Sequence, residues 1–168
     1  VGISHVIADR PCKAEEVAAK WNLPFSIVKR ADFQSVEDWS SFLFPPDVDL
    51  HVLGGFLSKV VVPQQCRGKV LNIHPSLLPK YGGKGMYGIK VHEAVIANKE
   101  KFSGCTVHIV DDEYDHGEIV EQIVQAVLPW DDAASLQHAV QKMEKRLYPR
   151  AILNFLRGKR LNKVSISD

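Results

Sequence analysis

Short apolar segments alternate along this chain with segments whose apolar residues recur at helical spacing. This alternation predicts strands within 1–9, 25–30, 48–56, 69–75, 104–112 and 118–128, and helices within 13–23, 35–44, 89–101 and 135–158. Strands that alternate with helices are typical of an α/β fold. We therefore predict a single α/β domain over residues 1–168, with an open sheet that is parallel in its first half.

The length and the net charge of the chain narrow the class of protein to which it can belong. Its 168 residues suffice for one hydrophobic core. Lys and Arg number 21 against 20 Asp and Glu, and no polybasic cluster occurs, so neither nucleic acid nor an anionic membrane is expected as a partner. No apolar stretch approaches the ~20 residues that span a bilayer, and no signal-peptide pattern opens the chain.

The cysteines indicate the compartment. Cys12, Cys66 and Cys105 are odd in number, far apart and in no CxxC pattern. This spacing argues against both a disulfide framework and a zinc site, and it fits a reducing environment. We therefore expect a soluble, cytoplasmic protein.

Two polar residues stand in the apolar strand predicted at 69–75. Asn72 and His74 are two residues apart, so they share one face of the strand. Pro75 ends the strand, which puts both side chains near its carboxyl edge, where open α/β sheets bind ligands. The residues alone equally allow a structural interpretation, with His74 bonded to a core carbonyl and Asn72 capping a turn.

The segment 111–119, DDEYDHGEI, is strongly acidic. Composition alone favours a solvated turn. However, Asp115 precedes His116-Gly117, where a sharp bend is expected, and an aspartate there can orient an imidazole and stabilise its charged form. An Asn, a His and an Asp could then form an oxyanion-stabilising acid–base group for acyl chemistry. Ser76 lacks a GxSxG elbow, which favours direct transfer over an acyl-enzyme.

Metal binding is the competing chemical interpretation. The seven histidines form neither HxxxH nor HExxH. His108, Asp111 and His116 could clamp a cation, but we predict no metal.

Three segments resemble one known family. They are LNIHPSLLP at 71–79, GCTVHIVDDEYDHGEIV at 104–120 and MEKRLYPRAI at 143–152. Together they resemble the phosphoribosylglycinamide formyltransferases, folate-dependent enzymes of purine synthesis in the formyltransferase superfamily. The similarity covers nearly the whole chain. It implies the formyltransferase fold, a Rossmann-like, mostly parallel open sheet with helices on both faces. GGKGMYG, at 82–88, is similar to a family variant in which this loop is longer.

The resemblance implies a catalytic trio of Asn72, His74 and Asp115. The amine of glycinamide ribonucleotide would attack the formyl carbon of the co-substrate 10-formyltetrahydrofolate. Asn72 and a protonated His74 would hydrogen-bond the developing oxyanion. Asp115 would keep His74 charged and help to relay the proton of the amine through water.

The resemblance also implies two binding regions. The folate pocket would be formed by two segments, 55–60 and the 110–115 loop, including Leu57, Ser58, Val60, Val110, Asp111 and Asp112. Glu144 would contact the sugar of the ribonucleotide, with Gln141 one turn earlier and Pro75 nearby. Without the resemblance, Glu144 would be interpreted as an exposed helix charge. The expected partners are these two small molecules alone, in a monomer or homodimer.

One difference between this sequence and the family's pattern leaves other functions possible. The family begins with a strand and a GSGSN-type loop that cradles the substrate phosphate, whereas residue 1 corresponds to the family's second strand. We expect the missing segment to precede Val1. The alternatives are a 10-formyltetrahydrofolate deformylase, a methionyl-tRNA formyltransferase and, from another class, a non-catalytic folate- or nucleotide-binding module, which the missing phosphate loop would favour.

Overall fold

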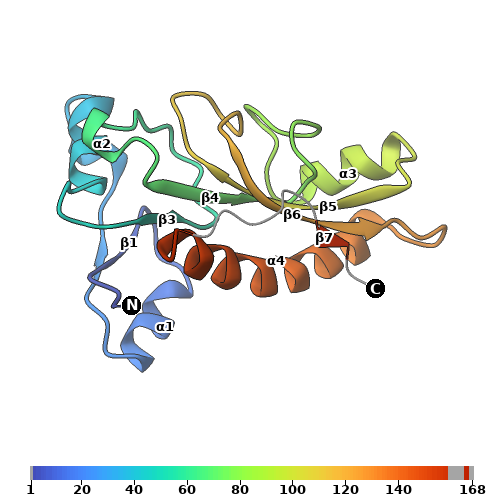
Figure 1. Ribbon diagram of the computed structural model, residues 1–168, viewed down its shortest axis with the longest axis horizontal. Helices are drawn as coiled ribbons and strands as arrows, with labels where there is room; N and C mark the ends of the chain where they lie inside the picture. Colours follow the sequence, from blue (N-terminus) through green and yellow to red (C-terminus); the bar gives the residue numbers. More distant parts are fainter. Residues whose placement is uncertain (1, 159–164, 167–168) are drawn as a thin grey trace. The chain divides into compact units, whose positions relative to one another are not determined.

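The computed structural model describes residues 2–158 and 165–166 (Figure 1). The chain divides into two compact units. The N-terminal unit comprises Val1–Asp49 and Ser58–Cys66, and the C-terminal unit comprises Leu50–Leu57 and Arg67–Asp168. The single domain expected over residues 1–168 stays a prediction.

The N-terminal unit is built on one parallel strand pair. Strand β1 (Val6–Ala8) pairs with β2 (Phe25–Ile27), and helix α1 (Ala14–Lys20) connects them. Helix α2 (Val36–Leu43) begins at Ser35, whose side chain accepts a hydrogen bond of 3.0 Å from the backbone N–H of Asp38 and so caps the helix. Two short 3₁₀ helices complete the unit, η1 (Arg30–Asp32) and η2 (Gln64–Cys66).

The C-terminal unit contains a mixed five-stranded sheet in the order β3-β4-β5-β6-β7. The pairs β3–β4 and β6–β7 are parallel, and β5 is antiparallel to both of its neighbours. The strands are β3 (His51–Leu53), β4 (Val70–His74), β5 (Phe102–Ile109), β6 (Ile119–Ala126) and β7 (Ser165–Ile166). The α/β class and the parallel pairing in the first half of the chain are thus confirmed.

Two helices complete this unit, α3 (Ile89–Ala97) and α4 (Ala133–Leu156). Helix α4 begins with a capping box, in which Asp132 and Ser135 each accept a bond from the other's backbone N–H. It runs along the sheet (Figure 1). Its buried side chains recur at helical spacing and form one apolar core with residues of β4, β5 and β6: Leu71, Cys105, Val107, Ile123, Leu136, Val140, Met143, Leu147 and Ala151.

Tyr148 ties α4 to the two parallel strands. Its hydroxyl donates toward the carbonyl oxygens of Leu53, at 2.7 Å, and Leu71, at 2.9 Å. These carbonyls belong to β3 and β4, respectively. The helix therefore fixes the strand that carries Asn72 and His74.

The register of the antiparallel strands decides which side chains meet. Asn72 of β4 lies opposite His108 of β5, and His74 lies opposite Thr106. The pairing of β5 with β6 is irregular at Val107 and His108, as in a β-bulge.

No helix among the described residues combines the length and the apolar character that crossing a bilayer requires.

Candidate active site

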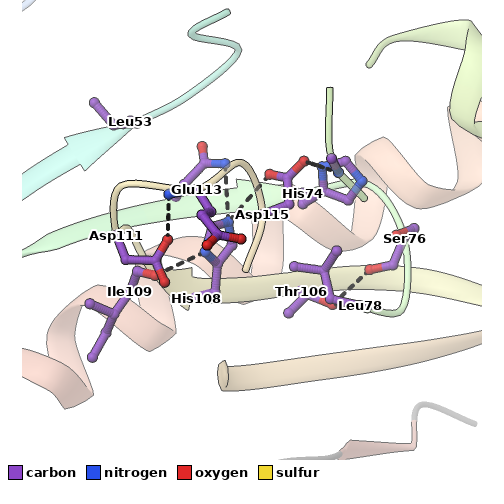
Figure 2. A network of polar contacts seen from close by, with 12 residues as sticks. Leu53, His74, Ser76, Leu78, Thr106, His108, Ile109, Asp111, Glu113 and Asp115 are labelled. Carbon is purple, nitrogen blue, oxygen red and sulfur yellow. Dashed lines mark hydrogen bonds and ion pairs between the residues drawn. The ribbon is translucent and has the colours of Figure 1, made fainter. Parts of the chain in front are cut away.

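The structure brings together the three residues of the predicted trio. Asn72 and His74 lie at the end of β4, and Asp115 lies on the loop between β5 and β6. His74 Nδ1 is 3.3 Å from Asp115 Oδ2, and only 5% and 11% of the two side chains are exposed (Figure 2). An imidazole and a carboxylate so close and so shielded from water interact more strongly than a surface pair.

A fourth side chain, His108, links Asn72 to Asp115. Its Nδ1–H donates to the carbonyl of Ile109 at 3.0 Å. Its Nε2 is 3.3 Å from Asn72 Nδ2 and 3.6 Å from Asp115 Oδ1. In the neutral ring Nε2 accepts from the Asn72 amide, and in the protonated ring its N–H donates toward Asp115. In either case Asn72 keeps an N–H hydrogen that can serve a substrate oxygen. The sequence pattern indicates His108 only as a ligand of a hypothetical cation site. The signal for its place beside Asn72 is the register of β4 and β5.

Both ring nitrogens of His74 face acceptors. Nε2 donates to the carbonyl of Tyr81 at 2.8 Å, and Nδ1 faces the carboxylate of Asp115. A neutral imidazole has only one N–H, so this arrangement fits the doubly protonated ring. Since the Tyr81 carbonyl occupies Nε2, Nδ1 is the donor that a reacting oxygen can share with Asp115.

Asp115 is held as a carboxylate. Burial by itself would raise the pKa of Asp115, but hydrogen bonds from His108, His74 and the backbone N–H of Gly83, at 3.0 Å, outweigh burial and hold that pKa well below its usual range. Asp115 has a φ of +55°, a left-handed conformation that aspartate tolerates better than most residues.

A glycine makes the bend after Asp115 possible. A Cβ on Gly117 would lie 1.8 Å from the carbonyl oxygen of Ile109, so no larger residue fits there without a backbone shift. The close approach of the Ile109 carbonyl therefore requires glycine at position 117, where the sequence predicts a sharp turn.

Two further titratable groups lie close enough to His74 to respond to its charge. Burial raises the pKa of Glu144, and the charge of His74 partly opposes that rise. Burial, together with the charge of His74, lowers the pKa of His92 to about 4. Glu144, the residue predicted to contact the ribose, is half-buried on α4. Because the charge of His74 affects its pKa, Glu144 lies close enough to the trio to interact with it electrostatically.

The other residues predicted to contact the ribonucleotide flank the site. Pro75 follows His74 directly and is half-buried. Gln141 is exposed on α4, one turn before Glu144. Their contacts with substrate stay predictions.

The residues predicted for the folate pocket lie in both units. In the C-terminal unit, the backbone N–H of Val110 donates to the backbone carbonyl oxygen of Val70 at 2.8 Å. Asp111 accepts from His116 Nδ1 at 2.9 Å within the loop, and Asp112 pairs at 2.6 Å with Arg67, which precedes β4. Leu57 is 43% exposed.

The N-terminal unit holds the other two members of that set. Ser58 Oγ donates to Asp9 at 3.2 Å, and Val60 is buried. The folate pocket stays a prediction.

A metal site is not formed by the residues that the structure describes. Within 2–158 and 165–166, no group of three or more His, Cys, Asp or Glu side chains is placed to hold an ion. The hypothetical cation site fails because His108 faces Asn72 and Asp115, whereas His116 is exposed and pairs with Asp111.

Comparison with known proteins gives consistent matches. The family model described as formyl transferase matches residues 3–152. A chloroplastic phosphoribosylglycinamide formyltransferase of Vigna unguiculata is 45% identical over 108 residues, 63% of this chain and 35% of that protein. The Arabidopsis thaliana protein of the same name is 35% identical over 150 residues, 85% of this chain and 51% of that protein. This chain thus spans about a third of the first plant relative and about half of the second.

Among solved structures, the phosphoribosylglycinamide formyltransferase of Anaplasma phagocytophilum aligns with a TM-score of 0.82. The alignment has 28% identity and covers 99% of this chain and 87% of that one.

Proposed function

The chain belongs to the formyl transferase family, and we propose that it transfers the formyl group of 10-formyltetrahydrofolate to the amine of glycinamide ribonucleotide in purine synthesis. The observation that carries this proposal is the convergence of Asn72, His74 and Asp115 with His74 Nδ1 directed at the carboxylate. Relatives named for this activity support the choice of acceptor.

The first step forms the new bond. The lone pair of the substrate amine attacks the formyl carbon, and the carbonyl electrons move onto the formyl oxygen. The Asn72 amide and His74 Nδ1–H donate to this oxyanion. Preorganised donors of this kind are worth roughly 3–4 kcal/mol each when one is removed.

The second step breaks the bond to folate. The tetrahedral intermediate collapses, the bond from the formyl carbon to N10 breaks, and its electron pair returns to N10, which takes up a proton. The attacking nitrogen loses its proton in the same sequence. Because the pKa of Asp115 is so low, this carboxylate stores a proton poorly. Its role is to stabilise the charged His74 and to orient the water that carries the proton.

The ribonucleotide would bind on the side of α4. Glu144 is half-buried near His74, and its carboxylate oxygens are acceptors for sugar hydroxyls. Both proposed substrates are small molecules, and the reaction as written needs no metal.

Formyl transfer from 10-formyl-5,8-dideazafolate to glycinamide ribonucleotide tests the proposal. The release of 5,8-dideazafolate is followed spectroscopically, with and without ribonucleotide. We expect release that depends on the ribonucleotide and a formylated product by mass spectrometry. Formate release that is independent of the ribonucleotide would instead establish a deformylase. Folate binding without either reaction would establish a binding module.

The location of the protein needs its own test. The two plant relatives are named chloroplastic. The cytoplasmic location expected from the sequence therefore stays a prediction, to be checked by cell fractionation with an antibody.

A further inference from the structure

One loop holds both members of the His74–Asp115 pair through its backbone. Residues 76–83, called here the 76–83 loop, follow β4. The carbonyl of Tyr81 accepts from His74 Nε2 at 2.8 Å, and the N–H of Gly83 donates to Asp115 Oδ2 at 3.0 Å. A shift of this loop would therefore disturb the imidazole and the carboxylate together.

The start of the loop is fixed by the hydroxyl of Thr106, which is wholly buried on β5. Thr106 Oγ1 donates to the carbonyl of Ser76 at 2.6 Å and accepts from the N–H of Leu78 at 3.1 Å (Figure 2). Gln122, buried on β6, donates to the same oxygen at 2.8 Å and to the carbonyl of Leu78 at 3.1 Å. One donated and two accepted bonds use the full capacity of a hydroxyl.

The anchoring continues along the loop. Ser76 Oγ donates to the carbonyl of Lys80 at 2.6 Å. Tyr81, the next residue, has a φ of +57°, which non-glycine residues seldom adopt. Such a conformation persists only when the surroundings fix it. Here the bonds at Ser76 and Leu78 contribute, together with the Tyr81 hydroxyl, which donates to Glu100 at 2.9 Å.

We infer that Thr106 and Gln122 are positioning residues, which act through the 76–83 loop to hold His74 and Asp115 in their reactive arrangement. This inference rests on the proposed function. Neither side chain touches the reacting atoms. A buried polar network that is fully satisfied fixes one geometry, and losing one member leaves several buried groups without a partner.

The test replaces each side chain by an apolar residue of similar shape. T106V removes the hydroxyl, T106S restores it, and Q122M removes both amide bonds. S103A is the matched control, because Ser103 is also buried on β5 and its Oγ has no hydrogen-bond partner among the described residues. Circular dichroism and urea unfolding establish the folded fraction of each variant.

Two readouts separate positioning from a merely structural role. The first is kcat and KM for formyl transfer across pH. The second is independent of activity: the NMR titration of the His74 ring in histidine-labelled protein. The titratable groups near this ring, Asp115, Glu144 and His92, and His108 beside Asp115, are unchanged in every variant.

For T106V and Q122M we expect kcat to fall at least about tenfold with KM within about threefold, since displacements near 1 Å can cost about a hundredfold. The NMR signals of the His74 ring should differ from those of the unsubstituted protein, because its acceptors are no longer held in place. T106S should recover most of the rate, and S103A should match the unsubstituted protein in both readouts.

Other results overturn the inference. These are a normal kcat in the folded T106V and Q122M proteins, or a reduced kcat with an unaltered His74 titration. If T106V does not fold, Q122M decides alone by the same criteria. If the unsubstituted protein transfers no formyl group, the proposed function fails, and the His74 titration still decides whether the loop is held by Thr106 and Gln122.

Discussion

Replacing Asp115 by asparagine removes one negative charge and leaves the shape of the side chain almost unchanged. Asparagine also tolerates the left-handed backbone at this position, where φ is +55°. Its amide oxygen can still accept from the N–H of Gly83, which now bonds to the carboxylate at 3.0 Å. The substitution therefore tests the charge of Asp115 and preserves the loop.

The size of the effect follows from the contact that is weakened. His74 Nδ1 lies 3.3 Å from Asp115 Oδ2, and both side chains are nearly buried. A hydrogen bond to a charged group contributes about 1.5–3 kcal/mol, and 1.36 kcal/mol is a factor of ten in rate. If this stabilisation supports His74 as the oxyanion donor, kcat should fall about ten- to a hundredfold.

Stability should change in a defined pH range. The pKa of Asp115 is lower in the folded protein than its ordinary value of 3.8. The unfolded chain therefore binds more protons just below that pH, so this contribution to stability is present above pH ~4 and is lost as the pH falls through the folded pKa. The asparagine variant should lack this loss, which urea unfolding at neutral and acidic pH would measure.

The assay is steady-state formyl transfer with both substrates saturating, beside E93Q as a control. Glu93 is exposed on α3, so its substitution makes the same change of charge away from the trio. E93Q should keep the normal rate. A folded D115N protein with kcat within twofold of normal would refute the assigned role of the carboxylate.

Three further predictions concern buried or half-buried polar groups. E144A should raise KM for the ribonucleotide more than KM for the folate, because the carboxylate is proposed to contact the sugar; equal effects on both constants would contradict this. His92 has a pKa of about 4 against an ordinary 6.5, so the unfolded state binds more protons between these values and stability should fall by up to about 3 kcal/mol as the pH drops through them. H92L should remove that dependence in urea unfolding, and an unchanged slope would show that other groups cause it. Y148F should cost about 1–2 kcal/mol in urea unfolding, because the carbonyls of Leu53 and Leu71 lose their shared donor; a loss below 0.3 kcal/mol, within the usual scatter of surface changes, would mean that this bond is not needed.

The sequence predicted the helices and strands well where a periodic pattern of apolar residues extends over many positions. The helix predicted within 135–158 is α4, Ala133–Leu156, and the alternating segment at 118–128 contains β6. The strand predicted within 48–56 is only His51–Leu53. Among the described residues it pairs with β4 alone, and Gly55 turns the chain with a φ of +63°. Strand β7 has two residues, too few for any period to be detected.

The site was only partly predictable, because sequence patterns report side chains and not register. Alternation placed Asn72 and His74 on one face of β4. It could not place His108 opposite Asn72, since the offset between antiparallel strands depends on tertiary packing. The Tyr81 carbonyl and the Gly83 N–H are backbone groups, and nothing in a tyrosine indicates that it adopts a left-handed conformation.

The backbone of Asp115 also limits which residues position 115 can accept. A residue at position 115 must meet two requirements: it must carry a negative charge, and its backbone must tolerate a φ near +55°. Glutamate meets the first but adopts this backbone less readily and carries its carboxylate one carbon further out, whereas glycine and asparagine meet the second and lack the charge. A saturation library at this codon should therefore favour aspartate over glutamate, although the two residues carry the same charge.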